Sequence, residues 1–251
     1  MPVFSVSEDL DAAGAFPLSK EDLHHLRRVL RVKIGQAFTV LLPDGRQGLA
    51  CLEKLGGKVS GKILEAPLST DSAAQDSLPA SLAIALVRWP RLEWLVEKAS
   101  ELGVAEMLPL TLSQGSRDPK AVVSPAKIAR LQKISRESLK QCVRVSGPAI
   151  RPPMGLKEYL ANQPRGLKIW LDERATATPL MTLLSERGPQ EHYSLLIGPE
   201  GGFSPKERDL IQAADFLPVT LGAIKFRSET AAIYSLSVLD AFLFSSRGRK
   251  A

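Results

Sequence analysis

Short apolar runs separated by turn residues dominate the first part of this chain. Strands are predicted at 38–42, 48–55 and 59–64, with turns at 43–45 and 56–57. Strands of this length joined by such tight turns are typical of a small β-barrel. The barrel is therefore the fold that we expect for the first part of the chain.

A small, polar stretch without periodicity, 67–77, ends this pattern and is typical of a linker. We expect a β-barrel domain at 1–70, a linker at 71–80 and a second domain at 81–251.

Strand and helix patterns alternate in the second domain, which favours a parallel sheet with helices on both faces. Strands are predicted at 82–87, 106–110 and 167–171, and helices at 90–102, 125–144 and 179–186. Asp172 and Glu173 directly follow a strand, so we expect them at the edge of a ligand crevice if one exists there.

A glycine-rich loop at 198–202 lies between a short apolar strand, 193–197, and the start of a helix. Ser204 and Glu207 have the spacing of a capping box, and Pro205 between them suits a first helical turn. Strand, glycine loop and helix can build a ligand crevice, but the same pattern also serves as a simple connection. The loop alone favours neither interpretation.

A second strand, loop and helix follow in the same order. The apolar run 216–221 contains Pro218, and Ser228 is the predicted N-cap of the last helix, 228–246. This helix is apolar on most of its surface, which indicates burial on both sides and makes it a candidate subunit interface.

The net charge of +6 permits a polyanionic partner, and the distribution of the cations indicates where it would bind. Eight basic residues and one acidic residue lie in 120–151. Within the predicted helix the cations step by three or four residues and collect on one face. They are Lys127, Arg130, Lys133, Arg136, Lys140 and Arg144. A face with so few acids favours contact with phosphates over a merely solvated surface.

Other classes of protein find little support in the sequence. The two cysteines and three histidines have no metal-ligand spacing, and there is neither a secretion signal nor an apolar run of membrane-spanning length. We therefore expect a cytoplasmic protein with reduced thiols and no metal. The stretch 56–62 matches most of a phosphate-binding P-loop, but Ile63 stands where that motif needs a hydroxyl, so a hairpin turn is predicted.

Five motifs, in order along the chain, resemble those of one enzyme family. They are HLRRVLR at 25–31, KASELGV at 98–104, Glu137 with Gln141 and Arg144, GPEGG at 198–202, and LGAIKFRSETA at 221–231. Together they resemble the SPOUT RNA methyltransferases, in particular the family that methylates N3 of a uridine in 16S ribosomal RNA.

The resemblance implies a trefoil-knotted parallel sheet after a PUA-like RNA-binding barrel, a homodimer, S-adenosylmethionine as cofactor and a part in ribosome biogenesis. It places the cofactor against Leu171, Ile197, Gly198, Glu200, Gly201, Gly202, Leu221, Gly222 and Phe226. It places RNA, either 16S rRNA or the small ribosomal subunit, against His25, Arg27, Arg28, Arg31, Arg88, Arg136, Lys140 and Arg144.

Arg227 and Glu229 are the candidate catalytic residues. Uridine carries a proton on N3, so we expect Arg227 to stabilise negative charge at a neighbouring carbonyl oxygen. Glu229 is either the base or a carboxylate that favours the start of a helix. The chain departs from the family pattern at Ile224, Lys225 and Gly115. Two alternatives remain: a SPOUT enzyme with another target, such as a ribose 2′-hydroxyl, or a non-catalytic RNA-binding assembly factor.

Overall fold

The computed structural model describes most of the chain, which divides into two compact units. The described residues are 4–6, 14–42, 47–55, 58–65, 77–112, 123–142, 147–162, 164–173 and 177–247. One unit comprises Met1–Asp76 with Glu137–Ser146, and the other comprises Ser77–Arg136 with Gly147–Ala251. Most of the expected linker, 71–80, and the departure at Gly115 lie outside the described residues.

The first unit is built on a five-stranded sheet with the order β1-β3-β4-β5-β2. The strands are β1 (Phe4–Ser5), β2 (Ala15–Phe16), β3 (Ala37–Leu41), β4 (Gln47–Leu55) and β5 (Lys58–Glu65). Strands β3, β4 and β5 pair antiparallel, which confirms the three predicted strands to within one residue at each end. The P-loop-like stretch enters strand β5 rather than a helix. The turns 43–45 and 56–57 lie outside the described residues.

A helical segment that the hydrophobic pattern had not predicted lies between β2 and β3. Helix α1 (Lys20–His24) begins after Ser19, whose hydroxyl accepts a hydrogen bond from the Asp22 amide at 2.9 Å, and one π-helical turn (His25–Val29) follows it. Leu26 in this turn is fully buried in the core of the unit. The segment is thus anchored by one apolar side chain.

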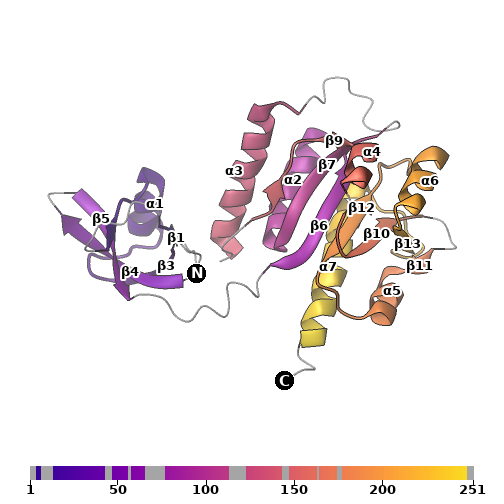
Figure 1. Ribbon diagram of the computed structural model, residues 1–251. Coiled ribbons are helices and arrows are strands. Elements are labelled where there is room, and N and C mark those ends of the chain that lie inside the picture. Colours follow the sequence, from indigo (N-terminus) through magenta and orange to yellow (C-terminus); the bar gives the residue numbers. More distant parts are fainter. Residues whose placement is uncertain are drawn as a thin grey trace. The chain divides into compact units, whose positions relative to one another are not determined.

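The second unit contains a sheet in which every pairing is parallel, as predicted (Figure 1). The order is β11-β13-β10-β12-β6-β7-β8, and β9 also pairs with β7. The strands are β6 (Leu78–Ala85), β7 (Val104–Thr111), β8 (Ala149–Ile150), β9 (Met154–Gly155), β10 (Leu167–Leu171), β11 (Thr178–Pro179), β12 (Tyr193–Ile197) and β13 (Leu217–Thr220). Strands β10 and β12 have the predicted bounds.

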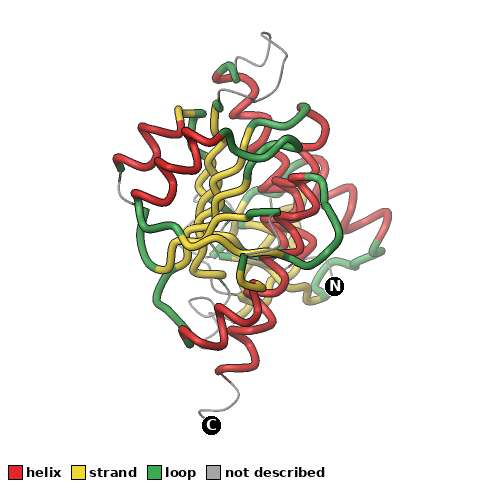
Figure 2. Tube along the Cα trace, turned by 90° about the vertical axis from the view of Figure 1, so that its right-hand side faces the viewer, coloured by secondary structure: helices red, strands yellow, loops and turns green. Residues whose placement is uncertain are grey.

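Helices cover both faces of this sheet, as Figure 2 shows. They are α2 (Trp89–Glu101), α3 (Pro125–Cys142), α4 (Leu156–Ala161), α5 (Leu180–Arg187), α6 (Pro205–Ala213) and α7 (Ser228–Arg247). Helices α2, α5 and α7 pack together over one apolar core, and α4 and α6 pack over a second. Buried residues of β12 alternate between the two cores, because successive side chains of a strand point to opposite faces.

The start of one strand and the contact made by one predicted cap differ from the prediction. Strand β6 begins at Leu78, four residues before the predicted start, because the pairing with β7 extends past the continuous apolar run. Helix α7 begins at Ser228, and the hydroxyl of this residue donates to the carbonyl oxygen of Gly198 at 2.8 Å. The predicted capping residue therefore joins two loops that lie thirty residues apart.

Within the described residues, no helix is long and apolar enough to cross a membrane. In the same part of the chain, no three side chains of His, Cys, Asp or Glu are grouped so that they could hold a metal ion.

Candidate functional site

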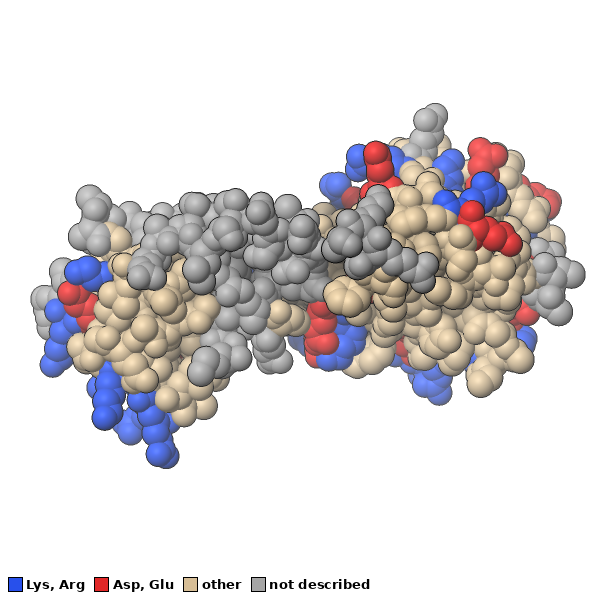
Figure 3. All heavy atoms as spheres, turned by 90° about the horizontal axis from the view of Figure 1, so that it is seen from below, with Lys and Arg blue, Asp and Glu red and all other residues tan. Residues whose placement is uncertain are grey.

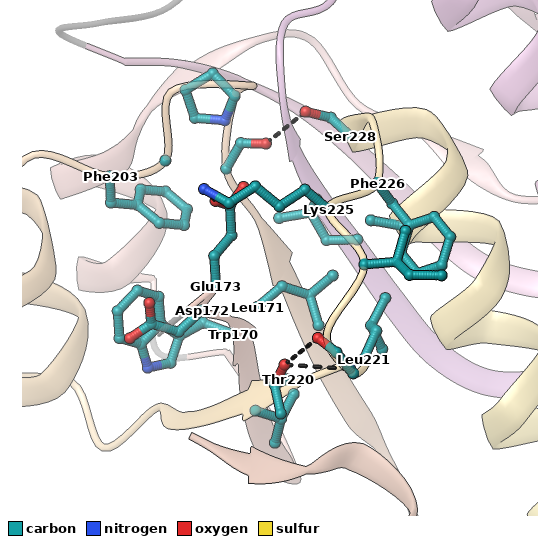
Figure 4. Close-up of a pocket in the computed structure, with 18 of the residues that line it drawn as sticks. Trp170, Leu171, Asp172, Glu173, Phe203, Thr220, Leu221, Lys225, Phe226 and Ser228 are labelled. Carbon is teal, nitrogen blue, oxygen red and sulfur yellow. Dashed lines mark hydrogen bonds and ion pairs between the residues drawn. The ribbon is translucent and has the colours of Figure 1, made fainter. Parts of the chain in front are cut away.

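A cavity of about 420 Å³ opens where strands β10, β12 and β13 end (Figure 4). Most of its lining comes from three stretches: 170–173 at the end of β10, 197–199 with 202–203 at the end of β12, and 219–226 with Ser228 at the end of β13. All three lie at the carboxyl edge of the parallel sheet, where open α/β sheets bind their ligands. The glycine-rich loop 198–202 is thus a wall of a cavity and more than a connection.

The loop 198–202 holds its shape through local contacts. The amide of Gly202 donates to the carbonyl oxygen of Pro199 at 2.8 Å, and Gly202 adopts a φ of +70°, which favours glycine. The predicted capping box is confirmed: the Glu207 carboxylate accepts from the Ser204 amide at 2.8 Å, and the Ser204 hydroxyl accepts from the Glu207 amide. The loop therefore enters α6 at a defined residue.

Gly198 allows close packing behind the loop. A β-carbon at this position would lie 2.9 Å from the ring of Phe203, whose side chain is buried. Phe203 packs edge-to-face on Trp170, with the ring centroids 5.7 Å apart, and both residues line the cavity. Because Gly198 has no side chain, the Phe203 ring can pack directly against the backbone of the loop.

The loop after β13 forms the opposite wall. Gly222 has a φ of +120°, and its amide donates to the Thr220 hydroxyl at 3.2 Å. Leu221 and Phe226 contribute apolar surface to the cavity, and Phe226 stacks on Tyr234 of α7. This wall of the cavity is therefore largely apolar, and its backbone conformation depends on Gly222.

Charged side chains lie both in the buried part of the cavity and at its opening. Asp172 is buried, and its carboxylate lies 3.7 Å from Arg208, whose guanidinium group lies over the Trp170 ring. At the opening, the Lys225 ammonium pairs with the Glu173 carboxylate at 2.7 Å, which joins two walls of the cavity (Figure 4). Asp172 and Glu173 thus lie at the crevice, as the sequence predicted.

Most of the residues expected to bind a cofactor lie together in this cavity. The lining includes Leu171, Ile197, Gly198, Gly202, Leu221, Gly222 and Phe226. Glu200 and Gly201 belong to the same loop as Gly198 and Gly202, but they do not line the cavity. Phe203 and Arg208 were missed, because only the fold brings the start of α6 against Trp170.

Arg227 and Glu229 lie beside the cavity rather than in its lining. Arg227 is exposed directly before α7, whereas the Glu229 side chain is only 8% exposed in the first turn of that helix. One Glu229 oxygen lies 3.4 Å from Nε of Arg91, and the other has no hydrogen-bond partner among the residues that the structure describes. Arg91, at the start of α2, was also missed by sequence reasoning.

The cations expected to bind RNA are distributed over both units. His25, Arg27, Arg28 and Arg31 are exposed around the π-helical turn, with only Leu26 between them buried. Figure 3 shows lysine and arginine side chains projecting from one side of the first unit.

In the second unit, Arg88 before α2 and Arg136 on α3 are exposed. The side chain of Lys140 and all of Arg144 lie outside the described part of the structure.

Part of the basic face of α3 contacts α2. The Lys127 ammonium lies over the Trp89 ring, 5.1 Å from its centroid, and Arg130 pairs with Glu93, which holds the pKa of Glu93 below its usual value. The first cations of the face therefore also serve the packing of the two helices, so the predicted phosphate-binding face is narrower there.

Two family models match the chain: an RNA methyltransferase domain over residues 74–240 and an RNA methyltransferase PUA domain over residues 18–63. The ribosomal RNA small subunit methyltransferase E of Synechocystis is 30% identical over 230 residues, which cover 91% of this chain and 73% of that protein. The Buchnera aphidicola protein of the same name is 27% identical over 96% of this chain and 93% of its own length.

Among solved structures, the ribosomal RNA small subunit methyltransferase E of Neisseria gonorrhoeae bound to S-adenosylmethionine has a TM-score of 0.78. It is 26% identical to this chain, and the match covers 96% of this chain and 97% of that one.

Proposed function

Because this chain belongs to the RNA methyltransferase family, we propose that it methylates N3 of a uridine in 16S ribosomal RNA with S-adenosylmethionine as the methyl donor. One observation carries the proposal. The two motif loops that resemble this family, far apart in sequence, form opposite walls of one cavity at the carboxyl edge of the sheet.

The cavity suits S-adenosylmethionine in size and in chemistry. Its volume of about 420 Å³ lies in the range of small-molecule sites. Leu171, Leu221 and Phe226 offer apolar surface for an adenine ring, and the carboxylates of Asp172 and Glu173, each beside a cation, add polar groups to the lining. When bound, the cofactor supplies an electrophilic methyl group on a sulfonium. The chain must chiefly align this group with its acceptor.

The residues at the start of α7 suit activation of the methyl acceptor, the N3 atom of uridine. The exposed guanidinium of Arg227 forms no ion pair within the described part of the chain and can stabilise charge on a uridine carbonyl oxygen when the N3 proton leaves. Glu229 offers a carboxylate oxygen without a hydrogen-bond partner there, which suits a proton acceptor. Its place in the first helical turn also suits a helix-start carboxylate, so the experiment below includes both residues.

RNA would bind through the exposed cations of each unit, and the PUA match over 18–63 includes the basic turn. We also propose a homodimer. It is supported by exposed apolar side chains on α7 and on α2, which packs against it; among them is Phe244 of α7, which is 78% exposed. A trefoil knot in the sheet domain and action in the cytoplasm follow from the same family assignment and are proposed with it.

The product of the reaction tests the proposal. The purified protein would be incubated with small ribosomal subunits and with free 16S rRNA, using labelled S-adenosylmethionine, and the methylated nucleosides would be identified by mass spectrometry. We expect 3-methyluridine. A 2′-O-methyl product would contradict the assigned position, and failure to bind the cofactor in calorimetry would favour the assembly-factor alternative.

Substitutions at the start of α7 separate the two catalytic assignments. Arg227→Ala should lower the single-turnover rate while the cofactor dissociation constant stays unchanged. Full activity of this variant would remove Arg227 from the mechanism. Glu229→Gln keeps the shape of the side chain, so a large loss of rate at unchanged thermal stability would identify a base, and lowered stability at an unchanged rate would identify a helix-start role.

A further inference from the structure

Arg91 connects the glycine-rich loop 198–202 to the first turn of α7. It lies in the first turn of α2, which follows β6 and begins at the same carboxyl edge of the sheet as the loops. Its Nη1 donates to Glu200 Oε1 in the loop 198–202, and its Nε lies 3.4 Å from Glu229 Oε1 in the first turn of α7. One side chain thus holds a residue of each motif.

The two carboxylates differ in their surroundings. The Glu200 side chain is 62% exposed, whereas the Glu229 side chain is almost fully buried. An exposed pair can exchange its partner for water, but a buried carboxylate depends on the cation beside it. Arg91 therefore has one buried partner, Glu229, and one exposed partner, Glu200, in the loop 198–202.

A second contact joins the same two segments. The Ser228 hydroxyl donates to the Gly198 carbonyl oxygen at 2.8 Å, so the first turn of α7 is tied to the start of the loop, while Arg91 ties it to the middle. Gly198 and Ser228 both line the cavity, whereas Arg91 is not among the lining residues described. Arg91 thus lies outside the lining but contacts a residue next to each of the two walls.

We propose that Arg91 is a positioning residue that sets the distance between the two walls before the cofactor binds, so that the cofactor does not have to order the loop. The inference rests on the proposed function in taking S-adenosylmethionine as the ligand. An arginine is needed because its planar group can meet two carboxylates from different directions, whereas a lysine presents a single point of charge.

The test measures cofactor binding without RNA. Calorimetry with S-adenosylmethionine would compare the wild-type protein with Arg91→Met, Arg91→Lys, Glu200→Gln and the double variant Arg91→Met/Glu200→Gln. Arg151→Met is the matched control, because Arg151 also pairs with a glutamate, Glu106, but on strand β7 away from the cavity.

We expect Arg91→Met to raise the dissociation constant about tenfold, in the range of coupled neighbouring residues. Arg91→Lys should lie between this variant and the wild type, Arg151→Met should bind normally, and the double variant should bind no more weakly than Arg91→Met alone. If Arg91→Met does not fold, Arg91→Lys and Glu200→Gln carry the test by themselves.

Two outcomes would overturn the inference. A lowered melting temperature with unchanged cofactor affinity would assign Arg91 to the stability of the fold, and unchanged affinity with a raised KM for RNA would assign it to RNA binding. A wild-type protein that binds the cofactor in the expected way but does not methylate rRNA would refute the proposed function and leave the role of Arg91 intact. A wild-type protein that does not bind the cofactor would refute both.

Discussion

Replacing Gly198 with alanine would place a methyl carbon against the ring of Phe203. The new β-carbon would lie 2.9, 3.1 and 3.2 Å from three ring atoms. Carbon atoms in contact prefer about 3.5–4.0 Å, so the ring would have to retreat by about 0.6 Å or more. Phe203 is buried and packs on Trp170, which is itself fully buried, so the ring could move only toward the cavity, where it would occupy space that the cofactor needs.

The expected loss of stability follows from this packing. Inserting a methyl group into a filled core costs about 1–3 kcal/mol. Alanine offsets about 0.4–1 kcal/mol of this by restricting the unfolded chain. The net destabilisation of about 1–2 kcal/mol corresponds to a melting temperature lower by about 2–8 °C in a domain of this size. Because Phe203 and Trp170 both line the cavity, cofactor affinity should fall as well.

Thermal unfolding followed by circular dichroism, and calorimetry with S-adenosylmethionine, would measure both effects. Gly155→Ala is the control, since Gly155 has a φ of −72° and a β-carbon there would meet nothing within 4 Å. We expect this variant to bind the cofactor normally and to lose less stability than Gly198→Ala, because its only cost is a poorer N-cap for α4. If Gly198→Ala were as stable as the wild type and bound the cofactor equally well, the steric argument would be refuted.

Three further substitutions test other contacts. Ser228→Ala leaves the Gly198 carbonyl oxygen without its 2.8 Å donor and should cost about 1–3 kcal/mol in chemical denaturation, whereas an unchanged midpoint would show that water replaces the hydroxyl. Burial, followed by the nearby charge of Arg165, lowers the pKa of His192 from its ordinary value of about 6.5, so the folded state binds its proton less readily than the unfolded state. The contribution of His192 to the free energy of unfolding is therefore fully present above pH 6.5 and declines as the pH falls below this value. His192→Gln should make the melting temperature depend less on pH in that range. Lys225→Met removes an ion pair with Glu173 that is 78% and 44% exposed at its two ends, so it should change stability by no more than about 1 kcal/mol, and a larger loss of stability would contradict the assignment of a solvent-screened pair.

The elements around the site could be predicted because their signals are local. Strands β10 and β12 are short apolar runs bounded by turn residues, and the capping box at Ser204 depends on residues three apart. The strands β8, β9 and β11 contain two residues each and have no period of their own. They exist because a neighbouring strand offers free backbone groups, and this depends on the tertiary structure.

The sequence by itself determined the order of the longer strands and helices and the composition of the two motif loops. Family resemblance assigned nine residues to the cofactor, and the structure brings seven of them into one cavity. The tertiary structure alone decided what supports these loops: Phe203 behind Gly198, Arg208 over Trp170, and Arg91 between Glu200 and Glu229. Arg91 and Glu200 are 109 residues apart, and no local pattern of charge or hydrophobicity marks such a pair. Hydrophobic periodicity depends on residues close together in the chain and therefore predicts single helices and strands. The shape of a cavity depends on which distant segments the sheet places side by side.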